Sequence, residues 1–198
     1  MKTPSARLAL FASGNGSNVQ RICDYFRENS RIQPVVLVCD RPSAPVLERA
    51  ARLGLPALCI DRERLGDPSF LLHALRAHKV SHIVLAGFLA LVPPFVLAEY
   101  PVLNLHPSLL PAFGGKGMYG NRVHRAVLAS GCPKSGITIH EANERYDEGK
   151  VIFQAECEVL PQDSEQTLAE RIHRLEHRYF PEVIEDWVLR FGDAVQHI

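Results

Sequence analysis

This sequence has no surplus of either charge and no long apolar run. Its 198 residues include 22 lysines and arginines against 22 aspartates and glutamates, so the formal net charge is zero. A general nucleic-acid or membrane-surface binder needs a basic surplus, and no stretch reaches the length of a membrane-spanning helix. We therefore expect neither nucleic acid nor a membrane among its partners, although a local basic pocket for one phosphate is compatible with a neutral chain.

The cysteines show no paired pattern. The five cysteines are odd in number and form no Cys-x-x-Cys pair, which favours buried thiols in a reducing compartment over a disulfide framework. The apolar run at residues 8–12 is too short for the core of a secretory leader, so we expect a cytoplasmic protein. The sequence has no internal repeat, low-complexity tract or linker, which predicts a single domain over residues 1–198.

What the sequence does contain is a regular alternation of apolar, strand-like runs with amphipathic stretches. In the first half this β-α-β-α rhythm predicts a parallel sheet with helices on both faces. The expected strands there are residues 8–12, 35–39, 57–60 and 83–86, and the expected helices are 19–26, 43–53 and 70–78. In the second half we expect strands at 102–104, 136–140 and 151–159, and helices at 122–129 and 164–189.

The predicted fold class is therefore α/β. It is a Rossmann-like, mainly parallel sheet with helices on both faces, closed by a C-terminal strand pair and a long helix.

A glycine-rich turn follows the first predicted strand. Gly14 and Gly16 lie between that strand and a helix, where small residues let backbone N–H groups face an anion. A dinucleotide fingerprint would need a third glycine at position 19, which is Val19, although Asp40 stands where a ribose-binding acid would be expected. The pattern favours a phosphate-binding loop over a nicotinamide site or a plain tight turn.

Polar side chains gather around strand ends in the second half. Asn104 and His106 alternate along a short strand, so both side chains can point the same way, at the carboxyl edge where open α/β sheets bind ligands. An amide donor can stabilise an oxyanion while an imidazole moves a proton. Asp147, in a polar turn, supplies a carboxylate that could hold the imidazole or a water. A lone histidine after a strand is more often structural, but the presence of Asn104, Pro107 and Asp147 beside His106 favours catalysis.

The motif Asn104-Leu105-His106-Pro107-Ser108 resembles the signature of the folate-dependent formyltransferases. The loop at residues 13–18 is similar to one branch of that family, in which the amino group of glycinamide ribonucleotide attacks the formyl carbon of 10-formyltetrahydrofolate during purine synthesis. Further similarities follow in the family's order, at residues 86–88, 136–140, 147–149, 152–154 and 176–177.

The resemblance implies a role for particular residues. It implies a catalytic trio of Asn104, His106 and Asp147. The residues implied to bind the ribonucleotide are Gly14, Asn15, Gly16, Ser17, Asn18 and Glu176. The residues implied to bind the folate are Arg64, Phe88, Leu89, Ala90, Leu91, Val92, Asn104 and His140, with Arg62 as a competitor for the place of Arg64. No metal is implied, and the expected partners are these two small molecules, with monomer and homodimer both open.

Two segments depart from the family pattern. Residues 113–120 form a longer glycine-rich loop, which we expect to be a mobile flap that becomes ordered around ligand. Residues 88–92 are wholly apolar, whereas other members often carry a basic residue there. Both departures concern folate selectivity and leave the trio intact.

Other functions fit the sequence less well. A relative that formylates methionyl-tRNA would add an RNA-binding domain and a basic surface, and a hydrolase of formyl-folate would add an N-terminal regulatory domain. His173 and His177 lie one helical turn apart, which raises metal binding, but they do not form a His-Glu-x-x-His motif. An inactive homologue acting as a binding module is disfavoured by the intact trio.

Overall fold

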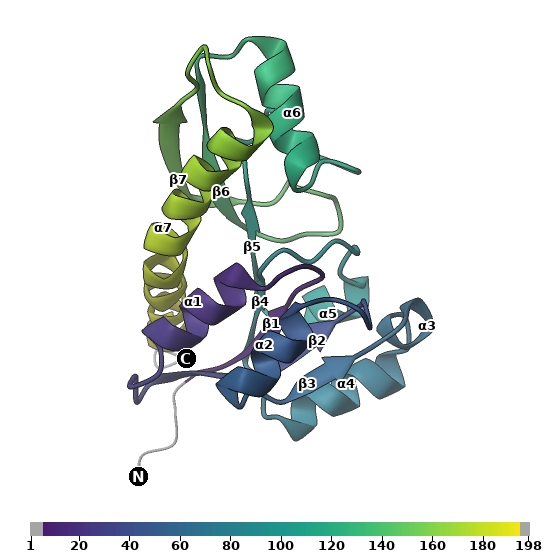
Figure 1. Cartoon of the computed structure of the whole chain (residues 1–198). Helices are drawn as coiled ribbons and strands as arrows, with labels where there is room; N and C mark the ends of the chain where they lie inside the picture. The colour runs from purple at the N-terminus through teal and green to yellow at the C-terminus, as the bar shows by residue number, and fades with distance from the viewer. Residues whose placement is uncertain (1–5, 195–198) are drawn as a thin grey trace.

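The protein is built around one twisted sheet, shown in a computed structural model that describes residues 6–194 (Figure 1). The sheet has seven strands in the order β3-β2-β1-β4-β5-β6-β7. The strands are β1 (Ala6–Phe11), β2 (Ile32–Cys39), β3 (Ala57–Cys59), β4 (His82–Leu85), β5 (Val102–His106), β6 (Lys134–Glu141) and β7 (Val151–Glu158). The helices are α1 (Ser17–Tyr25), α2 (Val46–Leu53), α3 (Arg62–Leu65), α4 (Pro68–Ala77), α5 (Pro94–Glu99), α6 (Asn121–Ser130) and α7 (Glu165–Ala194).

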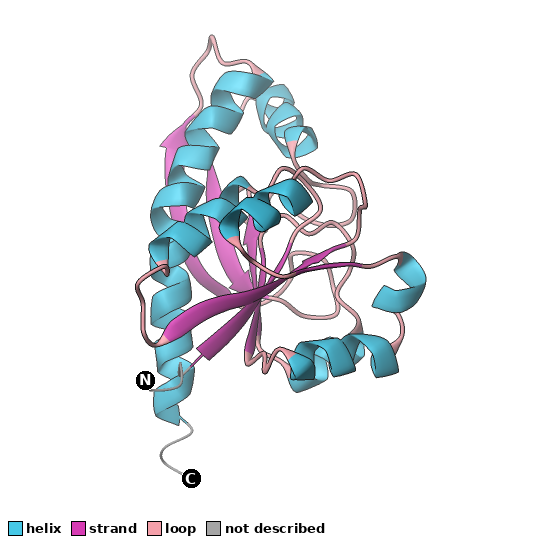
Figure 2. Ribbon diagram, turned by 60° about the horizontal axis from the view of Figure 1, so that its bottom comes forward, coloured by secondary structure: helices cyan, strands magenta, loops and turns pink. Residues whose placement is uncertain are grey.

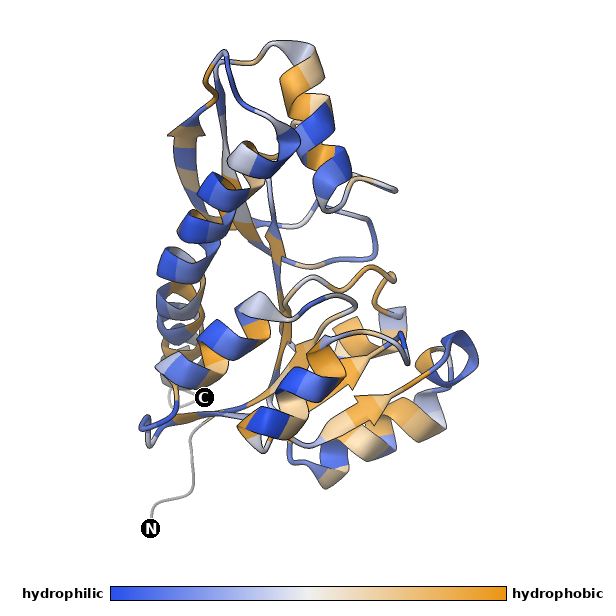
Figure 3. Ribbon diagram, in the orientation of Figure 1, coloured by the Kyte–Doolittle hydropathy of each residue, from blue (hydrophilic) through white to orange (hydrophobic). Residues whose placement is uncertain are grey.

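The first five strands run parallel, as the β-α-β-α rhythm predicts. Parallel strands in the middle of such a sheet are covered on both faces and therefore read as continuous apolar runs. In β1 every residue except Arg7 is buried, and all four residues of β4 are buried. Figure 3 shows the apolar residues concentrated on these strands, whereas the helices carry them on one side only.

Helices cover both faces of the sheet (Figure 2), and each face has its own apolar core. One core packs α1, α2, α6 and α7 against the sheet through residues such as Ile22, Ala50, Val127 and Ile172. The other packs α4 and α5 against the opposite face through residues such as Leu71 and Val96. The expected fold class is confirmed.

The last two strands change the direction of the sheet. β6 runs antiparallel to β5, and β7 antiparallel to β6, which is the C-terminal strand pair that the sequence predicts. The register places His140 directly opposite Asn104, and Thr138 opposite His106. Two segments far apart in sequence therefore present polar side chains side by side.

Some boundaries differ from the prediction. β2 begins at Ile32, three residues earlier than expected, and α2 begins at Val46 rather than at residue 43. Two short helices, α3 and α5, were not predicted. Pro93 and Pro94 look like helix breakers, but a proline in the first turn lacks only an N–H that would have no partner there, so α5 can begin at Pro94.

Candidate active site

A cavity of about 490 Å³ opens at the carboxyl ends of the parallel strands. This is the edge at which open α/β sheets bind ligands. With the exception of Arg64, every site residue predicted from the sequence lines it. The lining residues that were predicted are Gly14, Asn15, Gly16, Ser17, Asn18, Phe88, Leu89, Ala90, Leu91, Val92, Asn104, His106, His140, Asp147 and Glu176.

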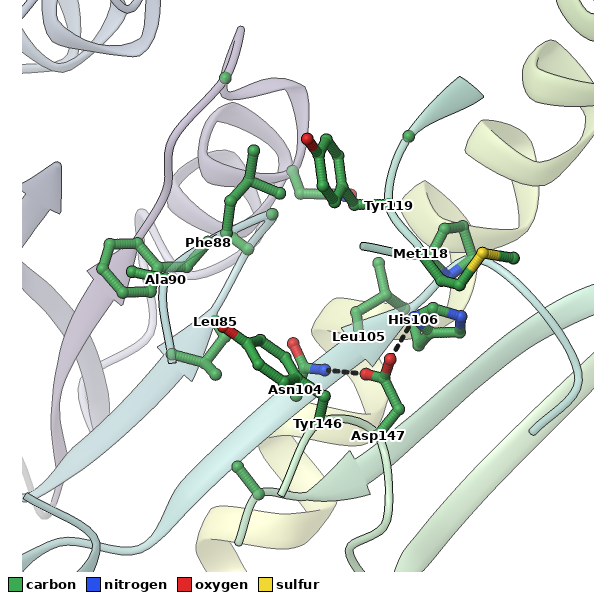
Figure 4. Close-up of a pocket in the computed structure, with 18 of the residues that line it drawn as sticks. Leu85, Phe88, Ala90, Asn104, Leu105, His106, Met118, Tyr119, Tyr146 and Asp147 are labelled. Carbon is green, nitrogen blue, oxygen red and sulfur yellow. Dashed lines mark hydrogen bonds and ion pairs between the residues drawn. The ribbon is translucent and has the colours of Figure 1, made fainter. Parts of the chain in front are cut away.

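The trio comes together in this cavity from two separate segments (Figure 4). Asn104 and His106 lie two residues apart on β5, so their side chains leave the strand on the same side. Asp147 reaches them from the loop after β6: one carboxylate oxygen, Oδ2, lies 3.4 Å from His106 Nδ1. The other oxygen, Oδ1, lies 3.4 Å from Asn104 Nδ2. One carboxylate thus holds both predicted partners.

Both ring nitrogens of His106 face groups that can only accept: Nε2 lies 2.9 Å from the backbone oxygen of Phe113, and Nδ1 lies 3.4 Å from Asp147 Oδ2. The shorter contact favours the hydrogen on Nε2 in the neutral ring. Nδ1, which faces Asp147, is then free to take up a proton. Burial lowers the pKa of His106, whereas the charge of Asp147 and the Phe113 carbonyl act to raise it, and the net pKa lies below the ordinary value. Near neutral pH the ring is a base.

Asp147 is held as a charged acceptor despite its burial. Burial acts to raise the pKa of Asp147, but contact with His140, the charge of His106 and the Gly115 N–H lower it, and the net pKa is below the ordinary value. The Gly115 N–H donates to Oδ2 at 2.9 Å. Asp147 also has a φ of 59°, a left-handed backbone that aspartate tolerates better than most residues. Strain of this kind is found where a loop must present a functional group.

His140 forms the layer behind Asn104. Its Nε2 lies 2.9 Å from Asn104 Nδ2, and its Nδ1 lies 3.0 Å from the Glu141 carbonyl oxygen. The carbonyl can only accept, so Nδ1 carries the hydrogen and Nε2 accepts from the Asn104 amide. Both hydrogens of that amide therefore face His140 and Asp147, and an amide that donates to a substrate oxygen must first give up one of these contacts.

A hydrogen-bonded layer beneath the trio was not predicted. The Thr138 hydroxyl donates to the Ser108 carbonyl at 2.7 Å and accepts from the Leu110 N–H at 2.9 Å. The Gln154 amide donates to that hydroxyl at 2.8 Å. Thr138 is fully buried, and it lies opposite His106 in the strand register, a pairing that the sequence does not record.

The opposite part of the cavity is made largely of backbone. The loop at residues 14–18 leads into α1, whose first-turn N–H groups have no partner within the helix. Behind it, Glu176 on α7 accepts a hydrogen bond from Asn18 Nδ2 at 2.9 Å. Glu176 is 5% exposed, and burial raises its pKa above the ordinary value although Asn18 and His173 oppose the shift. A buried polar pair beside free N–H donors is suited to a phosphorylated, hydroxylated ligand.

The apolar segment at residues 88–92 forms another wall of the cavity. Phe88 packs edge-to-face against Phe11 with ring centres 5.2 Å apart. The Leu89 N–H donates to the Ser13 hydroxyl at 2.9 Å, so this wall and the glycine loop are fixed to the same strand end. A flat, largely apolar ring system fits such a wall.

Arg64 is the one predicted site residue that the structure does not bring into the cavity. It lies on α3, and its guanidinium stacks over the Phe70 ring at 5.2 Å from the centroid. Lys116 and Tyr119 of the predicted flap also line the cavity, as do Arg145 and Tyr146 beside Asp147. The lining residues that the sequence reasoning missed include Arg122, His124 and His173. His173 could have been found, because it lies three residues before Glu176 on the same helix face.

Fold and cavity together define a Rossmann-like α/β protein whose cavity carries titratable side chains at the switch from parallel to antiparallel strands. Comparison with known proteins is more specific. The family model described as formyl transferase matches residues 6–184, and the chain belongs to the formyl transferase family.

The relatives and solved structures agree with this assignment. A phosphoribosylglycinamide formyltransferase of Bacillus subtilis (strain 168) is 36% identical over 186 residues, covering 90% of this chain and 93% of the relative. A chloroplastic enzyme of the same name from Arabidopsis thaliana is 40% identical, and the chain spans 64% of its length. The crystal structure of glycinamide ribonucleotide transformylase 1 from Geobacillus kaustophilus has a TM-score of 0.84 at 36% identity, covering 93% of this chain and 99% of that one.

Among the side chains that the structure describes, no group of three or more from histidine, cysteine, aspartate or glutamate could hold a metal ion. Over the same residues, no helix has both the length and the apolar character needed to cross a membrane.

Proposed function

We propose that this protein transfers a formyl group from 10-formyltetrahydrofolate to the amino group of glycinamide ribonucleotide. The observation that carries the proposal is that one cavity holds an array of backbone N–H donors, an apolar wall and the trio of Asn104, His106 and Asp147. The donors suit the substrate phosphate, the wall suits the pteridine ring, and the trio suits the transfer. The relatives named above carry the corresponding enzyme names.

The side chains supply what amine formylation requires. The attacking amine must lose a proton, and the formyl oxygen gains negative charge as the new carbon–nitrogen bond forms. His106 takes the proton at Nδ1, and the Asp147 carboxylate 3.4 Å away stabilises the imidazolium that results. Asn104 turns its amide N–H toward the formyl oxygen, which costs it a contact with His140 or Asp147. The proton finally reaches the nitrogen that leaves the formyl carbon.

The direct test is an assay with both substrates. The purified protein is incubated with glycinamide ribonucleotide and 10-formyltetrahydrofolate, and release of tetrahydrofolate is followed spectroscopically. We expect turnover that needs both substrates and persists in chelator. Omission of the ribonucleotide gives the rate of formyl-folate hydrolysis, and replacement by methionyl-tRNA tests the other formyl acceptor. Folate release that is independent of the ribonucleotide would contradict the proposal.

Location and assembly are also proposals. All five cysteines are free thiols, which is typical of a reducing compartment, and we propose the cytoplasm, although one relative is named as chloroplastic. We propose a monomer or a homodimer, which light scattering distinguishes.

A further inference from the structure

Helix α2 contacts the glycine loop in three places without lining the cavity. The Val46 N–H donates to the Gly14 carbonyl at 3.1 Å. Arg49 Nε donates to the Asn15 carbonyl at 2.9 Å. At Gly16 a Cβ would lie 2.3 Å from Val46 Cγ2, so the loop touches the helix there as well.

These contacts determine the direction of the loop's N–H groups. A trans peptide is planar, and its C=O and N–H point in opposite directions. Because Val46 draws the Gly14 carbonyl toward α2, the Asn15 N–H of the same peptide points away from α2. Because Arg49 draws the Asn15 carbonyl, the Gly16 N–H also points away from that helix.

The two N–H groups are available to a ligand. Within the described part of the chain, neither the Asn15 N–H nor the Gly16 N–H donates to a protein acceptor, and both residues line the cavity. Successive N–H groups aimed at one point form an anion-binding nest. The neighbouring Ser17 N–H is already used by the Asn15 side chain at 2.9 Å, so orientation of the first two donors matters most.

We propose that Arg49 is a positioning residue for the substrate phosphate. Its guanidinium holds the Asn15–Gly16 peptide in the orientation that presents the Gly16 N–H. The same guanidinium also donates to Gln20 Oε1 on α1 at 3.5 Å. A side chain outside the cavity thus sets ribonucleotide affinity while taking no part in formyl transfer. This inference rests on the proposed function.

The experiment compares Arg49→Gln with Arg52→Gln, which removes an equal charge from the next turn of the same helix, on an exposed side chain. We expect Arg49→Gln to raise the KM for the ribonucleotide about tenfold, the usual effect of losing one charge-assisted hydrogen bond. kcat, the KM for the folate and the thermal unfolding midpoint should stay near wild type. Arg52→Gln should change none of these values.

Inorganic phosphate is a second probe. Its inhibition constant against the ribonucleotide should rise by the same factor in Arg49→Gln, and Arg49→Lys should recover only part of the loss, because lysine keeps the charge without the planar fork. Equal effects of Arg49→Gln and Arg52→Gln would overturn the proposal in favour of a general charge effect. Unchanged ribonucleotide KM in Arg49→Gln would overturn it directly. Absence of wild-type turnover would instead refute the proposed function, and calorimetric binding of inorganic phosphate would still test Arg49.

Discussion

The two ends of the cavity present different chemical groups to a ligand. At residues 14–18 the ligand-facing groups are largely backbone N–H donors, held in place by α2 and by the start of α1. At the junction of β5 and β6 they are buried, titratable side chains gathered around one carboxylate. Backbone donors carry no titratable proton, so the N–H groups of the first end stay donors at any pH at which the fold is stable, and the titratable group beside them is Glu176. The second end can change charge and do chemistry.

The difference also decides which substitutions each end tolerates. The peptide groups of the loop are present whatever the side chains are, so that end fails only when the path of the backbone changes. At the other end, loss of a single oxygen or nitrogen removes a partner of His106 or Asn104. Three substitutions test this contrast.

The largest effect is expected at the side-chain end, for Asp147→Asn. The change keeps the shape but removes the charge that stabilises protonated His106. We expect kcat to fall by about 100- to 10,000-fold, with both ligands still bound nearly normally, because the lost interaction belongs to the transition state. The measurement is steady-state kinetics together with ligand binding by calorimetry.

The pH profile of the same variant tests the direction in which the pKa of His106 moves. In the wild type the negative charge of Asp147 raises the pKa of His106 against the effect of burial. Removing that charge lowers the pKa, so the limb attributable to His106 should move to lower pH. A variant with wild-type turnover and an unmoved profile would show that Asp147 is structural.

An intermediate effect is expected at the backbone end, for Gly16→Ala. Gly16 has a φ of 74°, and an added Cβ would lie 2.3 Å from Val46 Cγ2. The left-handed backbone and the overpacking each cost about 1–3 kcal/mol, so the free energy of unfolding should fall and ribonucleotide affinity should fall with it.

Gly14→Ala is the matched control, because nothing lies within 4 Å of its added Cβ and its backbone is not left-handed. It should unfold like the wild type in a denaturant titration. If Gly14→Ala and Gly16→Ala lose equal stability, the contact with Val46 does not shape the loop.

The smallest effect, and one of opposite sign, is expected for Glu176→Gln. Burial raises the pKa of Glu176, and the Oδ1 atom of its partner Asn18 is buried without a hydrogen bond. A glutamine can accept from Asn18 Nδ2 and donate to that oxygen. We expect the free energy of unfolding to rise by about 1 kcal/mol at pH 7, measured by urea titration.

The pH dependence checks the cause of that gain. An acid whose pKa is higher in the folded state costs stability above the folded value, and the cost disappears as the pH falls through the unfolded pKa near about 4.3. The advantage of glutamine should therefore shrink in acid. Glu185→Gln is the control, because Glu185 is already paired with Tyr25 and Asn29 at 2.8 and 3.0 Å; that change should destabilise the protein. A loss of stability in Glu176→Gln would contradict the prediction.

Much of this molecule follows from local patterns in the sequence. The apolar runs of β1 and β4 predicted buried parallel strands, and the alternation of Asn104 with His106 predicted that both side chains leave β5 on one side. The polar turn suggested a role for Asp147, and the family motif added one for Glu176, which no local pattern would assign. The family resemblance also implied a folate contact for Arg64. The structure stacks Arg64 on Phe70 outside the cavity, and the folate contact stays a prediction.

What the sequence by itself determined is each element's type and the side from which its residues project, because these depend on periods of two and 3.6 residues and on nearby glycine and proline. Only the tertiary structure decided which elements meet. The antiparallel register that sets His140 against Asn104, and the packing of α2 that directs the Asn15 and Gly16 N–H groups, join segments tens of residues apart. Such pairings depend on how all the apolar faces are buried at once, and no local spacing records that.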